Sequence, residues 1–244
     1  MKIVGVIPAR YSSSRLEGKP LADICGKPMI WWVYHNAIKV ERLEQVIVAT
    51  DDNRIMEECK RYNIPCMMTS IEHPTGSDRV SEVANKIEAD IFVTIQGDEP
   101  LLEKEIINEV IDILLNDEEV SCATLRTAFK NPVDVVNRTT PKVVCDLNGD
   151  IMLISRVEIP YPHNSLDIVY YKAIGTYAFR SNIIKKFSKL ERGPIELAED
   201  SELIRLLENG YKIRTRIVQS ETMSVDTKKD LMKIRKLIEK KIGE

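Results

Sequence analysis

IVGVIPARYSSSRLEGKP, residues Ile3 to Pro20, places a short apolar, β-branched run directly before a polar loop. The run stops at Pro8, and short runs of this composition are typical of buried strands rather than of helices. The loop that follows carries three cations, Arg10, Arg15 and Lys19. The segment therefore predicts a strand over residues 3–7 that leads into a cationic loop.

The same pattern recurs twice further along the chain. QVIVATDD (Gln45 to Asp52) and DIFVTIQGDEP (Asp90 to Pro100) are apolar runs that end in polar residues. Each follows a segment with helical spacing, residues 28–40 and residues 77–87. This alternation predicts an α/β fold with a Rossmann-like, mostly parallel sheet. Helices on both faces of the sheet are predicted by two further amphipathic segments, residues 53–63 and 105–115.

The polar ends of these three runs share one expected location. In open sheets of this kind, ligands bind beyond the carboxyl ends of the strands. VIPAR, VATDD and IQGDEP all fall at such ends. We therefore expect three polar loops to converge on one crevice.

The rhythm of the chain changes at about residue 121. KVVCDLNGDIMLISR (Lys142 to Arg156) predicts a hairpin about Asn148-Gly149, and YYKAIGTYAF (Tyr170 to Phe179) predicts one further strand. We expect both to extend the sheet in antiparallel fashion. The last predicted elements are a helix over 197–209, a strand over 213–218 and a charged helix over 228–242. No long linker intervenes, so we expect a single domain over residues 1–244 with an extension at about 121–210.

Composition excludes several classes of protein. With 43% hydrophobic residues, 30% charged residues and a net charge of -3, the chain matches neither disordered nor nucleic-acid-binding proteins. Its five cysteines form no CxxC pair, which argues against a zinc site or a disulfide framework. No apolar stretch approaches the roughly 20 residues of a membrane span, and Arg10 comes too early for a signal peptide. We therefore expect a cytoplasmic protein with reduced thiols and with neither a nucleic acid nor a membrane as partner.

The first loop suggests phosphate binding without a glycine-rich motif. Both GxGxxG and GxxxxGK[ST] are absent from it, which also argues against a nicotinamide-dependent oxidoreductase. Arginine and lysine side chains can neutralise a triphosphate instead, and Gly18 permits a close-approaching loop. A solvated basic loop is the alternative interpretation.

Two aspartates are candidates for holding a divalent cation. Asp98 ends the run IQGDEP, where a carboxylate would face the crevice and could bridge phosphates through a metal. Asp226 lies in MSVDTKKDL (Met223 to Leu231), just before the last predicted helix. A surface turn would explain the first equally well, and a helix N-cap the second.

Read together, these segments resemble the 3-deoxy-manno-octulosonate (KDO) cytidylyltransferase family, the CMP-KDO synthetases. The resemblance spans nearly the whole chain. It rests on IPARYSSSRLEGKPL at 7–21, GKPMI at 26–30, VIVATDD at 46–52, MTSIEHPTGSDRVSEV at 68–83, QGDEPL at 96–101 and SVDTKKDL at 224–231.

The resemblance implies a fold of the nucleotide-diphospho-sugar transferase type and a magnesium-dependent reaction. A hydroxyl of a 3-deoxy sugar acid, KDO or a close variant, would attack the α-phosphate of CTP and release pyrophosphate. It also implies a homodimer formed through the extension. A non-catalytic CTP-binding protein is the alternative, and such a protein would be expected to have lost Lys19 or a metal carboxylate.

The resemblance also assigns roles to individual residues. The catalytic residues would be Arg10, Lys19, Asp98 and Asp226, and the metal ligands Asp98 and Asp226. The nucleotide would be bound by Pro8, Ala9, Arg10, Arg15, Lys19, Thr75, Gly76, Ser77, Arg79 and Gln96. The acceptor would be bound by Arg156, Tyr177, Glu199 and Glu202. None of the three histidines has to act as a base.

Two positions depart from the family pattern on the acceptor side. Ala173 stands where a histidine is usual, and Leu203 stands where a glutamine is common. Loss of hydrogen-bonding groups changes substrate discrimination more than reaction type. An amino-modified or shorter sugar acid, or a phosphonate, is therefore an alternative acceptor.

Overall fold

The computed structural model describes residues 1–13, 15–164, 167–220 and 223–243, which leaves Ser14 of the first loop outside the description. The strands are β1 (Ile3–Ala9), β2 (Asp23–Ile24), β3 (Lys27–Pro28), β4 (Gln45–Thr50), β5 (Cys66–Met68), β6 (Ile91–Thr94), β7 (Cys122–Ala128), β8 (Lys142–Cys145), β9 (Ile151–Ser155), β10 (Tyr171–Ala173), β11 (Tyr177–Arg180) and β12 (Ile213–Ile217). The helices are η1 (Lys19–Leu21), a 3-10 turn, and α1 (Met29–Ala37), α2 (Asn53–Arg61), α3 (Gly76–Lys86), α4 (Lys104–Asn116), α5 (Pro132–Val135), α6 (Ser181–Phe187), α7 (Pro194–Glu199), α8 (Ile204–Glu208) and α9 (Lys228–Gly243). Within these ranges, no helix is both long and apolar enough to cross a membrane.

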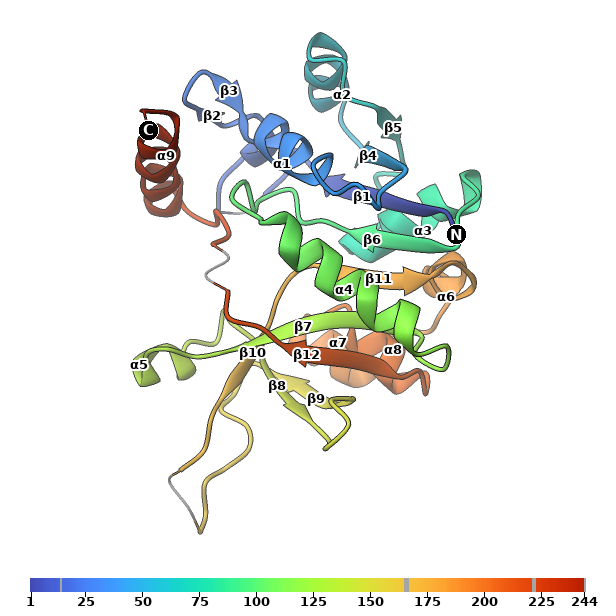
Figure 1. The fold of residues 1–244 in the computed structure, drawn as a ribbon, viewed down its shortest axis with the longest axis vertical. Coiled ribbons are helices and arrows are strands. Elements are labelled where there is room, and N and C mark those ends of the chain that lie inside the picture. The colour runs from blue at the N-terminus through green and yellow to red at the C-terminus, as the bar shows by residue number, and fades with distance from the viewer. Residues whose placement is uncertain (14, 165–166, 221–222, 244) are drawn as a thin grey trace.

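Ten of the described strands form one sheet, in the order β5-β4-β1-β6-β11-β7-β10-β8-β9, with β12 paired to β7 (Figure 1). Strands β5, β4, β1 and β6 are parallel, as the alternating pattern predicts. Strand β1 continues to Ala9, beyond the predicted end at Ile7. Pro8 is accommodated because the pairing of β1 with β6 ends at Val6, so the missing amide interrupts no bond of that ladder.

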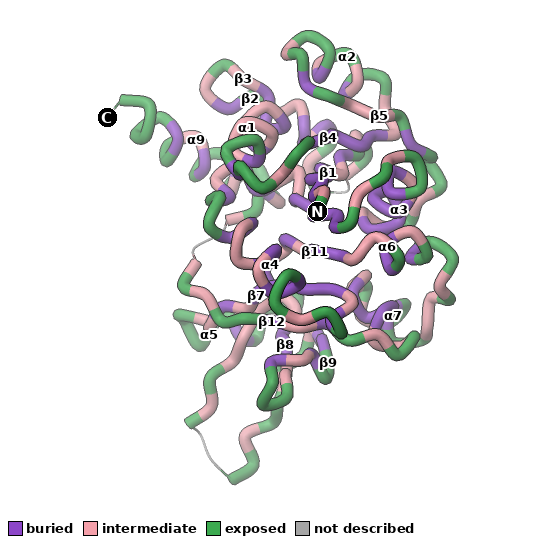
Figure 2. Tube along the Cα trace, turned by 45° about the vertical axis from the view of Figure 1, so that its right-hand side comes forward, coloured by how far each residue is buried: buried purple, intermediate pink, exposed green. Residues whose placement is uncertain are grey.

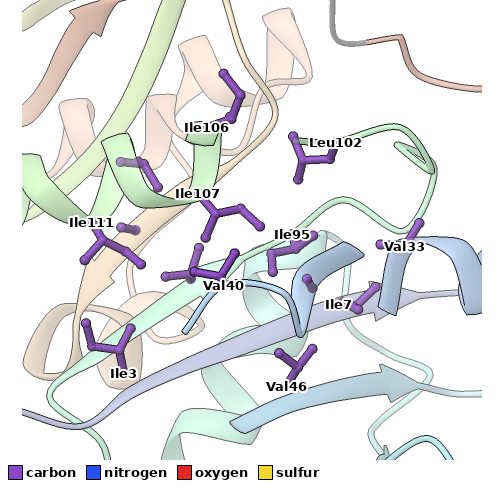
Figure 3. Close-up of a cluster of buried hydrophobic side chains, with 14 of the residues drawn as sticks. Ile3, Ile7, Val33, Val40, Val46, Ile95, Leu102, Ile106, Ile107 and Ile111 are labelled. Carbon is purple, nitrogen blue, oxygen red and sulfur yellow. The ribbon is translucent and has the colours of Figure 1, made fainter. Parts of the chain in front are cut away.

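Helices cover both faces of the sheet, as predicted. Helices α1, α2 and α4 pack on one face, and α3, α6 and α8 pack on the other (Figure 1). Figure 3 shows part of the first core, where Ile7 of β1 and Ile95, just after β6, lie among Val33 of α1 and Ile107 of α4. Because the parallel strands are buried on both faces, their sequences are nearly continuous apolar runs.

The predicted hairpin over 142–156 is confirmed as β8 and β9, but YYKAIGTYAF forms two strands instead of one. Strand β10 pairs with β7 and β8, whereas β11 pairs with β7 and β6. Between them, the carbonyls of Ile174 and Thr176 both accept a hydrogen bond from Thr124 Oγ1, at 2.9 and 3.1 Å. The strand pairing is therefore interrupted at Gly175, where the neighbour along this edge changes from β8 to β6. We call this interruption the opening of the sheet.

The single helix predicted over 197–209 is also divided. Helix α7 ends before Asp200, whose φ of 47° is left-handed, and α8 begins at Ile204. Arg205 of α8 is 1% exposed and ties the pieces together. It bonds Asp78 Oδ1 of α3 at 2.6 Å through Nη1 and Glu196 Oε1 of α7 at 2.8 Å through Nη2. A left-handed residue stops the helix, and a buried ion network fixes both halves on α3.

Helix α9 packs outside the main sheet, against the β2–β3 hairpin and the start of α1 (Figure 1). Its buried face consists of Leu231, Ile234 and Ile238. Val225, just before the helix, is fully buried in the same cluster. This docking returns the end of the chain to the neighbourhood of the first loop.

Replacing Arg205 with methionine tests the network. Arg205→Met leaves the carboxylates of Asp78 and Glu196 buried without their shared cation, and we expect it to lower the free energy of unfolding by about 3–5 kcal/mol. Arg192→Met is the matched control, because Arg192 binds the same Glu196 from a side chain that is 33% exposed. Its loss should cost about 1 kcal/mol or less. Urea unfolding of both variants measures the difference, and equal small losses would contradict the assignment.

Candidate active site

A cleft of about 630 Å³ opens at the carboxyl ends of β1 and β6. Its residues come from the first loop, the start of α3, the loop after β6, the opening of the sheet at Gly175, the turn between α7 and α8, and the segment before α9. They are Pro8, Ala9, Arg10, Ser12, Ser13, Arg15, Lys19, Pro20, Pro74, Thr75, Gly76, Arg79, Gln96, Gly97, Asp98, Glu99, Pro141, Arg156, Gly175, Tyr177, Asp200, Ser201, Glu202, Ser224 and Asp226. Segments more than 200 residues apart in the sequence thus share one cavity.

Lys19 lies between the two candidate metal ligands. Its Nζ is 2.7 Å from Asp98 Oδ2 and 3.3 Å from Asp226 Oδ1. Arg15 Nη2 lies 3.0 Å from the same Asp226 oxygen. Both carboxylates therefore contact one ammonium group and face the same part of the cleft.

The main chain also joins the two aspartates. The amide of Val225 donates to the carbonyl of Asp98 at 2.9 Å, and the buried Val225 side chain packs in the α9 cluster. Asp226 therefore reaches the cleft through helix packing rather than as a free terminus. Thr227 and Asp230 make the capping contacts at the start of α9, so Asp226 is not needed as an N-cap side chain.

The two aspartates suit an open magnesium site better than a metal site made only of protein ligands. Among the residues that the structure describes, no group of three or more histidine, cysteine or acidic side chains could hold a metal. Magnesium is usually held by one or two protein carboxylates together with water and substrate phosphates. A pair of aspartates beside three cations fits a cation that arrives with a polyphosphate.

The cationic loop is held in shape by an aromatic contact. The Arg54 guanidinium lies 3.2 Å from the centroid of the Tyr11 ring, and the amide of Gly18 donates to the carbonyl of Tyr11 at 2.9 Å. Gly18 has a φ of 66°, and a β-carbon there would lie 3.1 Å from the Tyr11 ring. These contacts close the loop on itself and present Arg10, which is exposed, at the cleft.

The start of α3 forms the second wall. Thr75 and Asp78 make a capping box, and the amide of Ser77 donates to Glu202 Oε2 at 2.9 Å. Arg79 is 3% exposed and bonds Asp51 at 2.6 Å, at the end of β4. The VATDD loop therefore supports the cleft through Asp51 but does not line it, contrary to the expectation that all three loops would.

The loop after β6 packs tightly against its neighbours. Gln96 Nε2 donates to the carbonyl of Gly175 at 2.9 Å, so this side chain spans the opening of the sheet. A β-carbon on Gly97 would lie 2.9 Å from the carbonyl oxygen of Pro8. Burial, and then the neighbouring charge of Asp98, raise the pKa of Glu99 to about 8. At pH 7 the Glu99 carboxyl is therefore largely protonated.

The expected acceptor end contains Arg156, Tyr177 and Glu202, whereas Glu199 lies behind the wall. Burial raises the pKa of Tyr177, and burial also raises that of Glu202. Glu199 accepts hydrogen bonds from Ser155 Oγ at 2.5 Å and from the amide of Arg156 at 2.9 Å. Its carboxylate therefore supports Arg156 from the side away from the cavity.

Most residues proposed from the sequence line this one cleft, and two do not. Ser77 and Glu199 are set back from it, and each contributes through the residue that it bonds. The histidines His35 and His73 bond Trp31 and Glu82 instead of lining it. The lining residues absent from the sequence-based assignment are Ser12, Ser13, Pro20, Pro74, Gly97, Glu99, Pro141, Gly175, Asp200, Ser201 and Ser224. Gly97 and Glu99 lie inside the recognised QGDEP segment and could have been included from it.

The two departures from the family pattern lie outside the lining. Leu203 is 2% exposed and belongs to the apolar core under α3, and Ala173 packs against the same core. Their side chains thus contribute apolar packing next to the acceptor end.

Comparison with known proteins agrees with this geometry. A family model described as cytidylyltransferase matches residues 4–215. A 3-deoxy-manno-octulosonate cytidylyltransferase of Fusobacterium nucleatum is 43% identical over 96% of this chain and 96% of its own length. The same enzyme of Escherichia coli is 40% identical over 100% of this chain and 98% of its own length. The chain belongs to the 3-deoxy-manno-octulosonate cytidylyltransferase family.

A solved structure agrees with this membership. CMP:2-keto-3-deoxy-manno-octonic acid synthetase complexed with CTP superposes with a TM-score of 0.94, at 40% identity over 99% of this chain and 100% of that chain. As a cytidylyltransferase, the chain is a nucleotidyltransferase enzyme. Such enzymes work chiefly by aligning reactants and neutralising charge on phosphate oxygens, and the cluster of cations and aspartates described above can do both.

Gly175→Ala tests the contact between the opening of the sheet and the loop after β6. A β-carbon would lie 2.8 Å from Gln96 Cγ and 3.1 Å from Glu99 Oε1, so both side chains must move. We expect cytidylyltransferase activity to fall at least about tenfold, because small displacements of reacting groups are costly. Thermal unfolding should show a loss of about 1–3 kcal/mol, typical of overpacking. Wild-type activity in the folded variant would show that Gln96 has no role in the cleft.

Proposed function

We propose that this enzyme transfers CMP from CTP to KDO, with magnesium as cofactor and pyrophosphate as the second product. The observation that carries the proposal is Lys19 between Asp98 and Asp226, with Arg15 beside them, in the large cleft. The names of the relatives from Fusobacterium nucleatum and Escherichia coli support the acceptor. The CTP complex of the synthetase structure supports the nucleotide.

The cationic side chains of the first loop bind and neutralise the triphosphate. In the free enzyme Lys19 is paired with the two carboxylates, and magnesium, which Asp98 and Asp226 would hold, supplies charge neutralisation at the phosphate oxygens when bound. Lys19 is then available to donate to a phosphate oxygen. Arg10 and Arg15 stand on the same loop and stabilise charge on the departing pyrophosphate.

The reaction is a direct displacement at the α-phosphorus. The acceptor hydroxyl forms the new P–O bond, the bond to the bridging oxygen of the pyrophosphate breaks, and the hydroxyl proton is released to solvent. No enzyme nucleophile is required for this displacement. The cleft residues act by binding, by orientation and by electrostatic stabilisation.

The acceptor binds where the sheet opens. Tyr177 and Glu202 face the cavity there, and Ser201 lies beside them on the turn between α7 and α8. An amino-modified acid or a phosphonate was the alternative suggested by Ala173 and Leu203. Because neither residue lines the cleft, we favour KDO itself.

The enzyme acts as a homodimer in the cytoplasm. Figure 2 shows exposed stretches in the long loop that follows β9. The extension exposes several large apolar side chains, among them Met152 at 65%, Tyr161 at 81% and Val169 at 56%, and a second copy would cover them. The described cysteines are all free thiols, which is typical of a reducing compartment. These features support the two assignments.

Asp98→Asn and Asp226→Asn test the metal carboxylates. Each change keeps the size of the side chain and removes its charge, so we expect the fold to persist and pyrophosphate release to fall at least about 100-fold. Asp112→Asn is the control, because Asp112 of α4 pairs with Arg42 outside the cleft, and loss of this partly exposed ion pair should cost about 1 kcal/mol or less. Normal turnover in either cleft variant would refute the metal assignment. Turnover would also exclude a non-catalytic CTP-binding protein.

A panel of acceptors tests the substrate. With CTP as the nucleotide, we expect pyrophosphate release to be fastest when KDO is the acceptor. With KDO as the acceptor, we expect slower release from the other three nucleotides than from CTP. The panel includes amino-modified 3-deoxy sugar acids, shorter sugar acids and small phosphonates. Turnover of one of these without turnover of KDO would replace the proposed acceptor. CTP binding without turnover of any acceptor would favour a non-catalytic protein.

A further inference from the structure

Arg156 uses most of its guanidinium on the protein's own main chain. Its Nε donates to the carbonyl of Glu199 at 2.6 Å, and its Nη2 donates to the carbonyl of Asp200 at 2.8 Å. Its Nη1 donates to the carbonyls of Arg138 and Thr139 at 3.1 and 3.3 Å. Of five N–H groups, one is left for a ligand. Arg156 thus joins two loops that form the acceptor wall, 138–141 and 199–202.

The side chain of Lys142 holds the main chain of Arg156 through its carbonyl group. Its side chain is fully buried, at 0% exposure, at the start of β8. The ammonium donates to the carbonyl of Arg156 and to the carbonyl of Asn137, both at 2.8 Å. Lys142 therefore connects the end of β9 with the start of the 138–141 loop.

A buried lysine at this place needs an explanation beyond stability. No carboxylate of the described residues lies within salt-bridge distance of its ammonium, and burial lowers the pKa of Lys142. Burying a charge is costly unless it is paired, and two neutral carbonyls do not pair the ammonium with an opposite charge. The two carbonyls that Lys142 holds, however, belong to both sides of the acceptor wall.

We propose that Lys142 is a positioning residue for the acceptor: by holding the carbonyls of Asn137 and Arg156, it fixes Arg156 and the two loops that Arg156 joins. This inference rests on the proposed function for the identity of the acceptor end. Lys142 itself does not line the cavity. Its effect reaches the acceptor through Arg156, and among the described residues neither Lys142 nor Arg156 bonds the first loop or α3, which would bind the nucleotide.

Lys142→Met is the direct test, with CTP and KDO varied separately. We expect the KM for KDO to rise at least about tenfold, since a wall shifted by a fraction of an ångström misplaces the acceptor. The KM for CTP should stay within about twofold of wild type, because neither Lys142 nor Arg156 bonds a residue proposed to bind the nucleotide. An unchanged KM for KDO, or an equal rise in both constants, would overturn the proposal.

Arg180→Met is the matched control. Arg180 also donates to main-chain carbonyls, those of Val120, Leu114 and Asp117, at 2.7–2.8 Å. It stands at the opposite end of β11 from Tyr177. We expect this variant to lose stability with both KM values unchanged. A selective rise in the KM for KDO here as well would show that any loosened loop has that effect, and would overturn the special role of Lys142.

Hydrogen exchange gives a readout that does not depend on turnover. In Lys142→Met, amides of residues 137–140 and 199–202 should exchange faster, while those of α2, on the other face of the sheet, stay as in wild type. Unchanged exchange in both loops would overturn the proposal even if the enzyme is active. If both loops exchange faster in the variant, and the wild-type enzyme turns over no sugar acid, the result would support the structural role of Lys142 and reject the proposed function. Should Lys142→Met not fold, Lys142→Gln, which keeps hydrogen-bond donors on a shorter side chain, is measured in the same way.

Discussion

One ammonium group, that of Lys19, lies between two carboxylates that are 128 residues apart in the sequence. Placing Asp98 requires the end of β6 to lie beside the end of β1, which parallel pairing provides. Placing Asp226 requires the chain to return after β12 and to be fixed by α9 on the β2–β3 hairpin. Both requirements are met by packing remote from the carboxylates themselves. The arrangement of Lys19 and the two carboxylates is thus a product of the whole fold rather than of a local motif.

The change from parallel to antiparallel strand pairing gives the cleft two ends that are built differently. The parallel strands β1 and β6 end in the loops that hold cations and the first carboxylate. At Gly175 the ladder opens between β10 and β11, and the cavity continues there toward Tyr177 and the turn at Asp200. In the proposed function, a nucleotide half and an acceptor half are therefore built from different kinds of strand pairing. The acceptor half depends on side-chain ties such as Arg156, because regular ladders do not hold its loops.

The sequence was sufficient for the parallel half and for most of the residues that line the cleft. Apolar runs that end in polar loops locate β1, β4 and β6, and the position of Lys19 follows from the loop after the first run. The antiparallel half was less predictable. Tyr170 to Phe179 has the composition of one strand, and only the hydrogen bonds from Thr124 show where it is interrupted. The left-handed Asp200 interrupts a helical pattern in the same way. Lys142 carries no sequence signal, since a lysine at the start of an exposed hairpin is ordinary and its burial depends on tertiary packing.

The most direct measurement is a crystal structure of the enzyme with CTP and Mn²⁺, located by its anomalous scattering. The account predicts one peak between Asp98 and Asp226, with Lys19 Nζ moved from the carboxylates to a phosphate oxygen. A nucleotide bound with no peak between the two aspartates, or with Lys19 still paired to both, would contradict the central claim.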